Sequence, residues 1–433
     1  MKRILLLRAS ILTIIIFAVT LTLSTPSEAK PYEQVDFKNV DEHALNTPKS
    51  AEKSVSKLAK YLLKEANTDL EKARAIFIWI TDRVEYDVKS YFSGRIKNQA
   101  PKRILKKKVA VCDGYSQLFK AIADEMGLET IKISGYAKGF GYQGNKRIEG
   151  PPNHAWNVVK IDGQWHFIDS TWAAGTVGYN RKYNKEFNEH YFLTPPDEFI
   201  GDHWTNDTKW QLLDEPISRD EYEKLLRPWP SYYKSGIKID SHRYGYIETK
   251  DTVEISILVE PGVTLMTTLH NGKEYIDKAF IFTKKKDDKY ILTLAFPKKG
   301  IYKFSISSAR EVKRNGITYF DSGIDYVIKA KKGIKSKKPF PEVFSKFHEL
   351  NGELFEPAEG LLKKNKKHSF KLKLPGASSV VINNNGEKTY LESDEDGTFE
   401  GEVELKKGEV TVLARYDRGN GYSETSLLKY EVR

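Results

Sequence analysis

The spacing of apolar residues changes part-way along this chain, and the change restricts the folds open to it. Apolar residues first recur every three or four positions, as in amphipathic helices: Val55, Leu58, Ala59, Leu62 and Leu63, then Leu70, Ala73, Phe77, Ile80 and Val84. Beyond about Pro230 they alternate, as in half-buried strands: Val253, Ile255, Ile257 and Val259, then Tyr302, Phe304 and Ile306. A chain of 433 residues is also too long for one ordinary core. We therefore expect an α+β domain followed by β-sandwiches.

The first domain is expected to span residues 30–230, with helices preceding strands. A helix is predicted to begin at Cys112 and to end at Gly127, because glycine suits the left-handed position that follows a helix. Residues 130–138 are typical of a strand. Residues 155–172 are typical of a hairpin whose two-residue loop is Asp162-Gly163.

Two series of strands follow, and we expect β-sandwiches at residues 234–332 and 338–433. A stretch rich in Lys, Gly and Pro around residues 331–339 separates them. Asn385-Gly386 is a turn signal within the second series. A Lys-Lys-Gly sequence precedes a strand in each series, which indicates a weak repeat of one module.

The first 29 residues have the pattern of a signal peptide. Lys2, Arg3 and Arg8 precede or interrupt an apolar run that ends near Leu23, and small residues stand before a cleavage point after Ala29. The alternative is an uncleaved membrane anchor, for which the run is short against the roughly 20 residues that span a bilayer. We expect a protein that is either secreted or associated with the cell surface or cell wall.

Basic residues outnumber acidic ones, and the full chain carries a formal charge of +11. Residues 1–29 contain three basic residues and one acidic residue, so the remainder carries +9. Such a charge attracts anionic cell-surface polymers or lipid headgroups, although scattered lysines also serve general solubility. The sequence contains no recognisable nucleic-acid-binding motif, so we expect no nucleic-acid partner.

Cys112 is the only cysteine, so the chain cannot form an intramolecular disulfide. A lone thiol is either a buried bystander or a nucleophile. At the N-terminus of a helix, the macrodipole and unpaired N–H groups favour the thiolate and a developing oxyanion. The predicted position of Cys112 therefore favours the nucleophile.

His154 and Asp169 are the partners that the predicted hairpin places beside one another. With Asp162-Gly163 as the loop, Trp156 faces Asp169, and His154 lies two residues earlier on the same face. Diagonal neighbours are roughly 7 to 8 Å apart and side chains can bridge them. His154 would take the thiol proton and Asp169 would orient the imidazole. Taken alone, each residue also has a structural interpretation. Cys112 could be a small core residue, His154 a hydrogen-bonded histidine of a strand, and Asp169 a turn residue or helix cap.

The motifs around these residues resemble the transglutaminase-like superfamily over residues 69–175. They are Ala73-Arg74-Ala75-Ile76-Phe77, Val111-Cys112-Asp113-Gly114-Tyr115-Ser116, Asn153-His154-Ala155-Trp156-Asn157 and Asp169-Ser170-Thr171-Trp172. The kyphoscoliosis-peptidase-like branch is the most similar, and residues 346–350 with the strands that follow resemble its Ig-like module. The resemblance implies a papain-type Cys-His-Asp triad, and Ig-like folds for the β-sandwiches.

Two positions qualify the resemblance. Ala110 stands where that family usually has glycine, which matters only if the backbone needs a positive φ. The family also has a second oxyanion donor, for which Trp79 and Tyr86 are candidates, with a core role as the alternative for both.

Asp202 and His203 suggest metal ligands, but the sequence places no suitable cluster with them. We therefore expect no metal and no cofactor.

The function that these residues indicate is thiol-dependent acyl transfer on the amide bonds of a protein or peptide. Water as the second substrate gives a cysteine peptidase or a deamidase, and an amine gives a transglutaminase. The sequence leaves that choice open, since it depends on the shape of the cleft. A peptide-glycan amidase with the same triad and a catalytically silent cell-surface scaffold are the alternatives.

Overall fold

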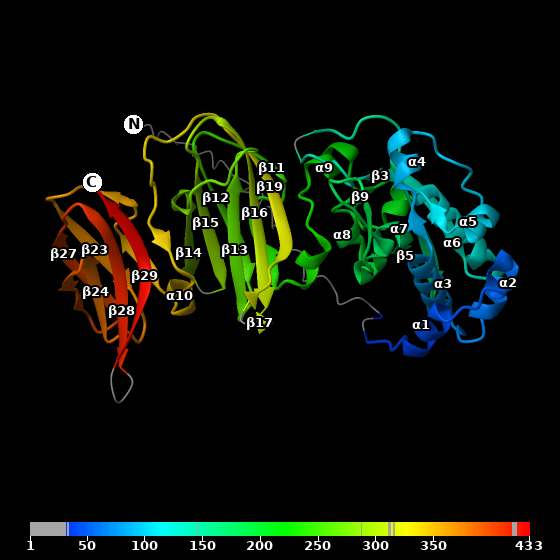
Figure 1. Ribbon diagram of the computed structural model, residues 1–433, viewed down its shortest axis with the longest axis horizontal. Coiled ribbons are helices and arrows are strands. Elements are labelled where there is room, and N and C mark those ends of the chain that lie inside the picture. Colours follow the sequence, from blue (N-terminus) through cyan, green and yellow to red (C-terminus); the bar gives the residue numbers. More distant parts are fainter. Residues whose placement is uncertain are drawn as a thin grey trace, which may run out of the picture. The chain divides into compact units, whose positions relative to one another are not determined.

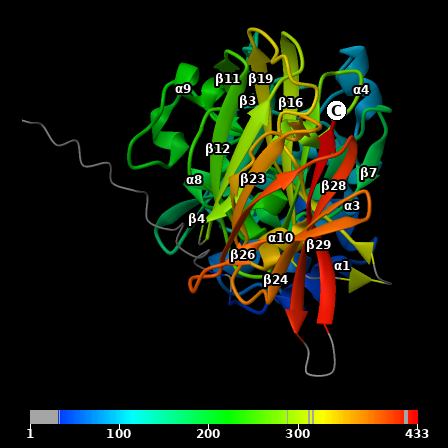
Figure 2. The same ribbon diagram turned by 90° about the vertical axis from the view of Figure 1, so that its left-hand side faces the viewer.

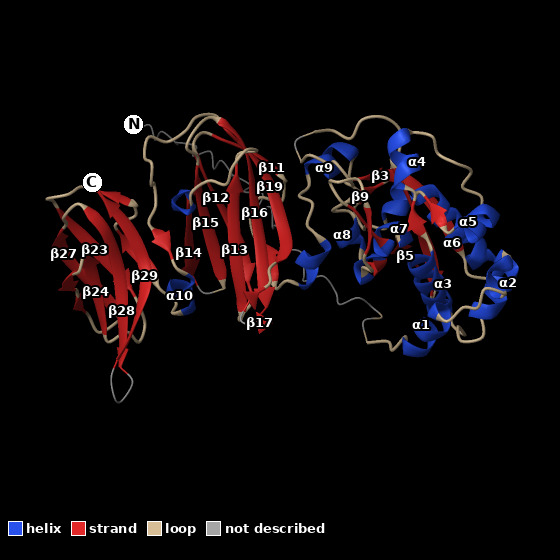
Figure 3. Ribbon diagram, viewed as in Figure 1, coloured by secondary structure: helices blue, strands red, loops and turns tan. Residues whose placement is uncertain are grey.

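The computed structural model describes residue 32 and residues 34–144, 146–286, 288–310, 313–314, 317–417 and 422–433. The predicted signal peptide, residues 1–29, lies outside the described residues. No helix of the described part is long and apolar enough to cross a membrane. Helices dominate the first half of the chain and strands the second, as Figure 1 and Figure 3 show, which confirms the predicted fold class.

The helices of the first part surround one central helix, α3. Its predicted capping box is confirmed, because Thr68 and Glu71 exchange both hydrogen bonds. The predicted apolar stripe is too narrow, since all residues from 73 to 81 are buried, where α1, α6 and α7 pack around α3. The helices are α1 (Lys38–Leu45), α2 (Val55–Leu62), α3 (Asp69–Arg83), α4 (Val88–Ser93), α5 (Pro101–Lys107), α6 (Cys112–Glu125), α7 (Ser170–Ala174), α8 (Pro196–Phe199) and α9 (Arg219–Lys224).

A five-stranded antiparallel sheet lies beside these helices in the order β8-β5-β4-β3-β9. Ile161 pairs with Gln164, so the predicted Asp162-Gly163 hairpin is confirmed. Helix α6 packs against β3 and β4, which brings its N-terminus to the sheet. The strands are β3 (Thr130–Ala137), β4 (His154–Ile161), β5 (Gln164–Ile168), β8 (Phe192–Thr194) and β9 (His203–Trp204). Two short pairs join β1 (Glu85–Tyr86) to β2 (Val109–Ala110) and β6 (Gly175–Val177) to β7 (Tyr183–Lys185).

Gly135 allows the middle of this sheet to pack closely. A Cβ at this position would lie 2.3 Å from the carbonyl oxygen of Trp204 and 2.4 Å from the indole of Trp156. Gly135 pairs directly with His154 across β3 and β4. The missing side chain therefore lets β9 and Trp156 approach the strand end that holds His154.

The first β-region consists of two four-stranded sheets, ordered β10-β12-β15-β14 and β11-β19-β16-β13. The alternating residues Ile255, Ile257 and Val259 are buried in a shared core, as their period of two predicts. The strands are β10 (Ile237–Ile239), β11 (Tyr246–Thr249), β12 (Thr252–Val259), β13 (Val263–His270), β14 (Ile281–Lys286), β15 (Lys289–Ala295), β16 (Gly300–Arg310) and β19 (Asp321–Ala330), with the short pair β17 (Lys313–Arg314) and β18 (Ile317–Thr318).

The second β-region has its own apolar core between two further sheets. Strands β28 and β29 pair along most of their length (Figure 2). Asn385 and Gly386 both have positive φ and join β24 to β25, so the predicted turn is confirmed. One sheet has the order β20-β29-β28-β24-β25 with β22 also on β29, and the other has the order β21-β23-β27-β26. The elements are β20 (Glu342–Val343), α10 (Ser345–Glu349), β21 (Glu353–Glu356), β22 (Leu361–Leu362), β23 (Lys367–Lys373), β24 (Ser379–Asn384), β25 (Glu387–Tyr390), β26 (Glu392–Ser393), β27 (Thr398–Glu404), β28 (Gly408–Asp417) and β29 (Tyr422–Val432).

Candidate active site

Cys112 is the first residue of α6, as predicted. The parallel pair of β1 and β2 fixes the chain just before it, and the N–H of Val111 donates to Oε1 of Gln99 at 3.0 Å. The N-cap residue Val111 provides no side-chain hydrogen bond to the first turn of α6. Cys112 itself is partly exposed. A partly accessible thiol therefore stands at the positive end of a helix dipole, where an anion is favoured.

The turn around Cys112 is closely packed, which explains its small residues. A Cβ on Gly114 would lie 2.3 Å from Oε1 of Gln99 and 2.9 Å from the Cβ of Ala110. Ala110 lies in β2, an extended strand, so its backbone does not need the positive φ that would favour glycine. Alanine at position 110, where that family usually has glycine, is therefore compatible with the local backbone.

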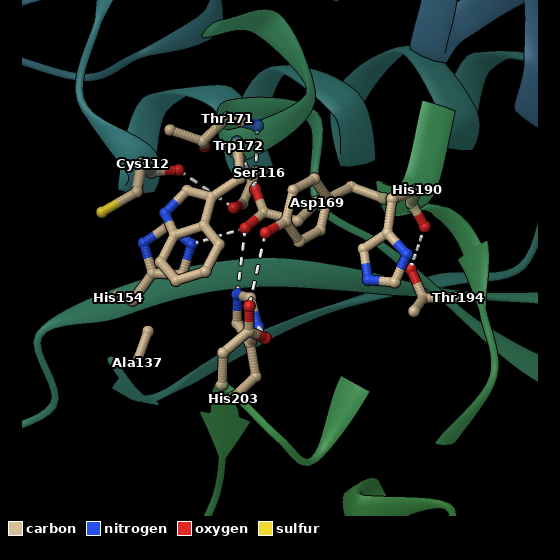
Figure 4. Close-up of polar contacts among 12 residues, drawn as sticks. Cys112, Ser116, Ala137, His154, Asp169, Thr171, Trp172, His190, Thr194 and His203 are labelled. Carbon is tan, nitrogen blue, oxygen red and sulfur yellow. Dashed lines mark hydrogen bonds and ion pairs between the residues drawn. The ribbon is translucent and has the colours of Figure 1, made fainter. Parts of the chain in front are cut away.

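His154 and Asp169 are in contact, as the hairpin geometry predicts. Nε2 of His154 lies 2.7 Å from Oδ2 of Asp169 (Figure 4). Asp169 follows β5 directly and is the N-cap of α7, where its Oδ1 accepts the N–H groups of Thr171 at 2.8 Å and Trp172 at 3.1 Å. These hydrogen bonds fix the carboxylate, and the imidazole is held through Nε2, which leaves Nδ1 for the thiol. Their catalytic role stays a prediction.

The charged forms of His154 and Asp169 stabilise each other. Burial by itself lowers the pKa of His154, but the Asp169 carboxylate and the neighbouring Cys112 sulfur outweigh it and raise that pKa to about 10. Burial by itself raises the pKa of Asp169, but His154 and His203 hold that pKa well below its usual range. At neutral pH the pair is therefore an imidazolium beside a carboxylate. An imidazolium next to a thiol favours the thiolate.

His203 is a second imidazole on the same carboxylate, and the sequence reasoning missed it. Its Nε2 lies 3.1 Å from Oδ2 of Asp169, and its Nδ1 lies 2.5 Å from Oδ1 of Asp202 (Figure 4). His203 lies on β9, which pairs with β3 through Ala137. A two-residue strand has no detectable period, so the only sequence signal was the Asp202-His203 pair itself.

The expectation that no cluster of potential ligands accompanies His203 is wrong. Nitrogen or oxygen atoms of His154, Asp169 and His203 all lie within 4.8 Å of one another, a spacing at which three such groups could hold a metal ion. The same atoms are also joined by the two hydrogen bonds to Oδ2 of Asp169. Hydrogen bonding alone therefore accounts for their approach, and the absence of a metal stays a prediction.

Aromatic rings cover the buried side of the cluster. The ring centroid of Trp172 lies 5.2 Å from that of His154 and 4.4 Å from that of His203. Trp156 lies 5.1 Å from His203 in an edge-on arrangement. These rings exclude water from the carboxylate, and a low local dielectric strengthens the hydrogen bonds that it accepts.

Tyr86 is better placed than Trp79 to contact a reacting group at Cys112. The indole of Trp79 is fully buried within α3, and the ammonium group of Lys108 lies 4.2 Å from its ring centroid. Burial and then the nearby Cys112 raise the pKa of Tyr86, so its hydroxyl stays protonated and can donate. Trp79 thus has a packing role, and Tyr86 remains the candidate for the second oxyanion donor.

Family comparisons match two consecutive parts of this chain. Residues 56–170 match the model of the transglutaminase-like superfamily, which spans Cys112, His154 and Asp169. Residues 219–341 match the model of the KY-like, immunoglobulin-like domain. That match lies in the first β-region, whereas the sequence resemblance to the Ig-like module was drawn for residues 346–350 and the strands after them.

Individual proteins show the same relationship. The chain is 33% identical to kyphoscoliosis peptidase of Mus musculus over 252 residues, which is 58% of this chain and 37% of that protein. It is 30% identical to hillarin of Drosophila melanogaster over 260 residues, which is 57% of this chain and 32% of that protein. The chain thus spans about a third of the length of these relatives. A solved TGase structure aligns with 37% of this chain and 38% of its own, at 17% identity and a TM-score of 0.20.

Proposed function

Because the chain carries a transglutaminase-like superfamily domain followed by a KY-like immunoglobulin-like domain, we propose that it is a thiol-dependent acyl-transfer enzyme acting on amide bonds. Its substrates are proteins or peptides, and it acts as a cysteine peptidase or as a transglutaminase-like acyltransferase. The observation that carries this proposal is the 2.7 Å contact between Nε2 of His154 and Oδ2 of Asp169. That contact leaves Nδ1 of the imidazole for the sulfur and the leaving group.

The reaction begins when the thiolate of Cys112 attacks the carbonyl carbon of an amide. The carbonyl oxygen becomes an oxyanion, for which the N–H of Cys112 and the hydroxyl of Tyr86 are the candidate donors. His154 gives its Nδ1 proton to the amide nitrogen, the C–N bond breaks, and an amine leaves a thioester on Cys112. Water or a second amine then attacks the thioester, His154 takes the proton, and the thiolate is restored.

Export is a second part of the proposal. Residues 1–29 have the charge and apolar pattern of a signal peptide, and the remaining charge of +9 suits a surface rich in anionic polymers. N-terminal sequencing of chain recovered from the culture medium or cell wall is expected to begin at Lys30. Recovery of a chain that retains Met1 in the membrane fraction would contradict cleavage and support an anchor.

The reactivity of Cys112 tests the enzymatic proposal without a known substrate. Because His154 keeps its proton up to about pH 10, iodoacetamide is expected to alkylate residues 30–433 rapidly at pH 6.5 and to show a second step near pH 10. His154→Ala is expected to lower the rate at pH 6.5 by roughly ten- to a hundred-fold, with reactivity returning as pH approaches about 8.5, where a free thiol ionises.

A single cysteine makes this readout unambiguous. The matched control is His166→Ala, on the neighbouring strand β5, which is expected to keep the wild-type profile. If the thiol is accessible but wild type and His154→Ala titrate alike near pH 8.5, the ion pair does not exist. The binding scaffold would then be the better interpretation.

A further inference from the structure

The two ring nitrogens of His203 contact two carboxylates at once. Oδ2 of Asp169 receives His154 at 2.7 Å and His203 at 3.1 Å. The other nitrogen of His203 lies 2.5 Å from Oδ1 of Asp202. The side chain of His203 is fully buried. The two imidazoles thus share Oδ2 of Asp169 (Figure 4), and His203 links that carboxylate to Asp202.

Packing alone does not explain this histidine. Its ring stacks on Phe199 with centroids 4.0 Å apart and an interplanar angle of 13°. A phenyl ring would serve that contact without burying polar atoms. A buried polar group costs free energy unless it is hydrogen-bonded, and here both ring nitrogens face carboxylate oxygens. The two hydrogen bonds, rather than the packing of the ring, therefore explain why position 203 is a histidine and not an apolar residue of the same shape.

Hydrogen-bond chemistry indicates what His203 supplies. His203 lowers the pKa of both carboxyls against the effect of burial, and an ionised carboxylate only accepts hydrogen bonds. Both sides of His203 are satisfied together only when both of its nitrogens carry protons. The charged and titratable groups around it are Asp169, Asp202, His154 and Tyr191, whose hydroxyl donates to Oδ2 of Asp202 at 3.3 Å. Arg227 and His190 add positive charge near Asp202.

We propose that His203 is a positioning residue. It donates a hydrogen bond to Oδ2 of Asp169, which holds the carboxylate toward His154 and offsets part of the negative charge of that carboxylate. The inference rests on the proposed function. Its first consequence is geometric, because the second donor keeps Oδ2 aimed at Nε2 of His154. Its second consequence is electrostatic. Because Oδ2 of Asp169 accepts from His203 as well as from His154, it attracts the His154 proton less strongly, and that proton is easier to transfer to a leaving group.

Two substitutions separate these consequences from packing. His203→Phe keeps a ring against Phe199 and removes both hydrogen bonds. His203→Gln keeps an N–H donor near Asp169. Alkylation of Cys112 is followed from pH 5 to pH 11 in each protein, and thermal unfolding is followed by tryptophan fluorescence.

We expect His203→Phe to lower the alkylation rate at pH 7 by roughly tenfold, because the carboxylate loses its second anchor. His203→Gln is expected to restore most of that rate. In His203→Phe the upper step, set by His154, is expected to move to higher pH by roughly half to one unit, because Oδ2 of Asp169 loses its second donor and attracts the His154 proton more strongly.

The matched control is His166→Gln, another histidine of the same domain, on strand β5. It is expected to unfold at a lower temperature with an unchanged alkylation profile. The same result for both His203 variants would show that His203 only packs, and would overturn this inference while leaving the proposed function intact. A wild-type profile with one step near that of a free thiol would overturn both.

Discussion

Cys112→Ala is expected to abolish acyl transfer, with a fall in kcat on the order of 10⁶-fold, because no other cysteine can form the thioester. The measurement uses a protein substrate such as casein, with a fluorescent primary amine, so that amine incorporation and peptide release are followed together. Either product in the wild type identifies the second substrate, amine or water. Both are expected to vanish in the variant.

Folding of the variant is checked in the same domain. Six of the seven tryptophans of the chain lie between Trp79 and Trp210, before the first β-region, and most of the fluorescence therefore reports the part of the chain that holds Cys112. Trp229 instead donates a hydrogen bond to Asp325 of the first β-region. Because Cys112 is partly exposed, Cys112→Ala is expected to leave the unfolding temperature nearly unchanged. Retention of activity would mean that another nucleophile acts. A wild type inactive on every amide, whose cell-wall binding survives Cys112→Ala, would favour the scaffold interpretation.

Asp169→Asn is expected to lower kcat by roughly 10³- to 10⁴-fold, with little change in KM. The Asn oxygen would replace Oδ1 and accept the N–H groups of Thr171 and Trp172. Its NH₂ group would then stand where Oδ2 accepts from His154 and His203, so donors would face donors. His154 loses its orienting acceptor, and the alkylation rate of Cys112 at pH 6.5 is expected to fall in parallel.

The same substitution has a defined effect on stability. The lowered pKa of Asp169 gives stability that is present above the unfolded value of about 3.9 and lost as pH falls. The raised pKa of His154 gives stability that is full below its unfolded value of about 6.5 and lost as pH rises toward about 10. Wild type is therefore expected to exceed Asp169→Asn in stability most clearly between about pH 4.5 and 6.5.

The control for Asp169→Asn is Asp87→Asn. Asp87 is also a buried helix cap, accepting the N–H of Ser90 at 3.0 Å and its hydroxyl at 2.7 Å. Asp87→Asn is expected to lower stability while leaving the alkylation profile of Cys112 in place. Equal loss of alkylation in both variants would show that capping, rather than the contact with His154, explains the effect of Asp169→Asn.

Features that depend on neighbours in sequence were predictable. The capping box of Thr68 and Glu71, the Asp162-Gly163 hairpin and the Asn385-Gly386 turn all follow from backbone geometry over a few residues. Because side chains alternate along a strand, the hairpin register also placed His154 beside Asp169. The predicted helix start at Cys112 is also confirmed.

Other features depend on which distant segments meet, and only the tertiary structure decided them. The full burial of residues 73–81 required α1, α6 and α7 to surround α3, which one helix period cannot indicate. The approach of His203 to Asp169 required β9 to add to the edge of β3, across more than sixty residues of sequence. A two-residue strand has no period and no turn signal of its own. The sequence alone thus determined the helix start at Cys112 and the contact between His154 and Asp169, while long-range strand pairing added the second histidine and its carboxylate, because those contacts are set by packing rather than by local geometry.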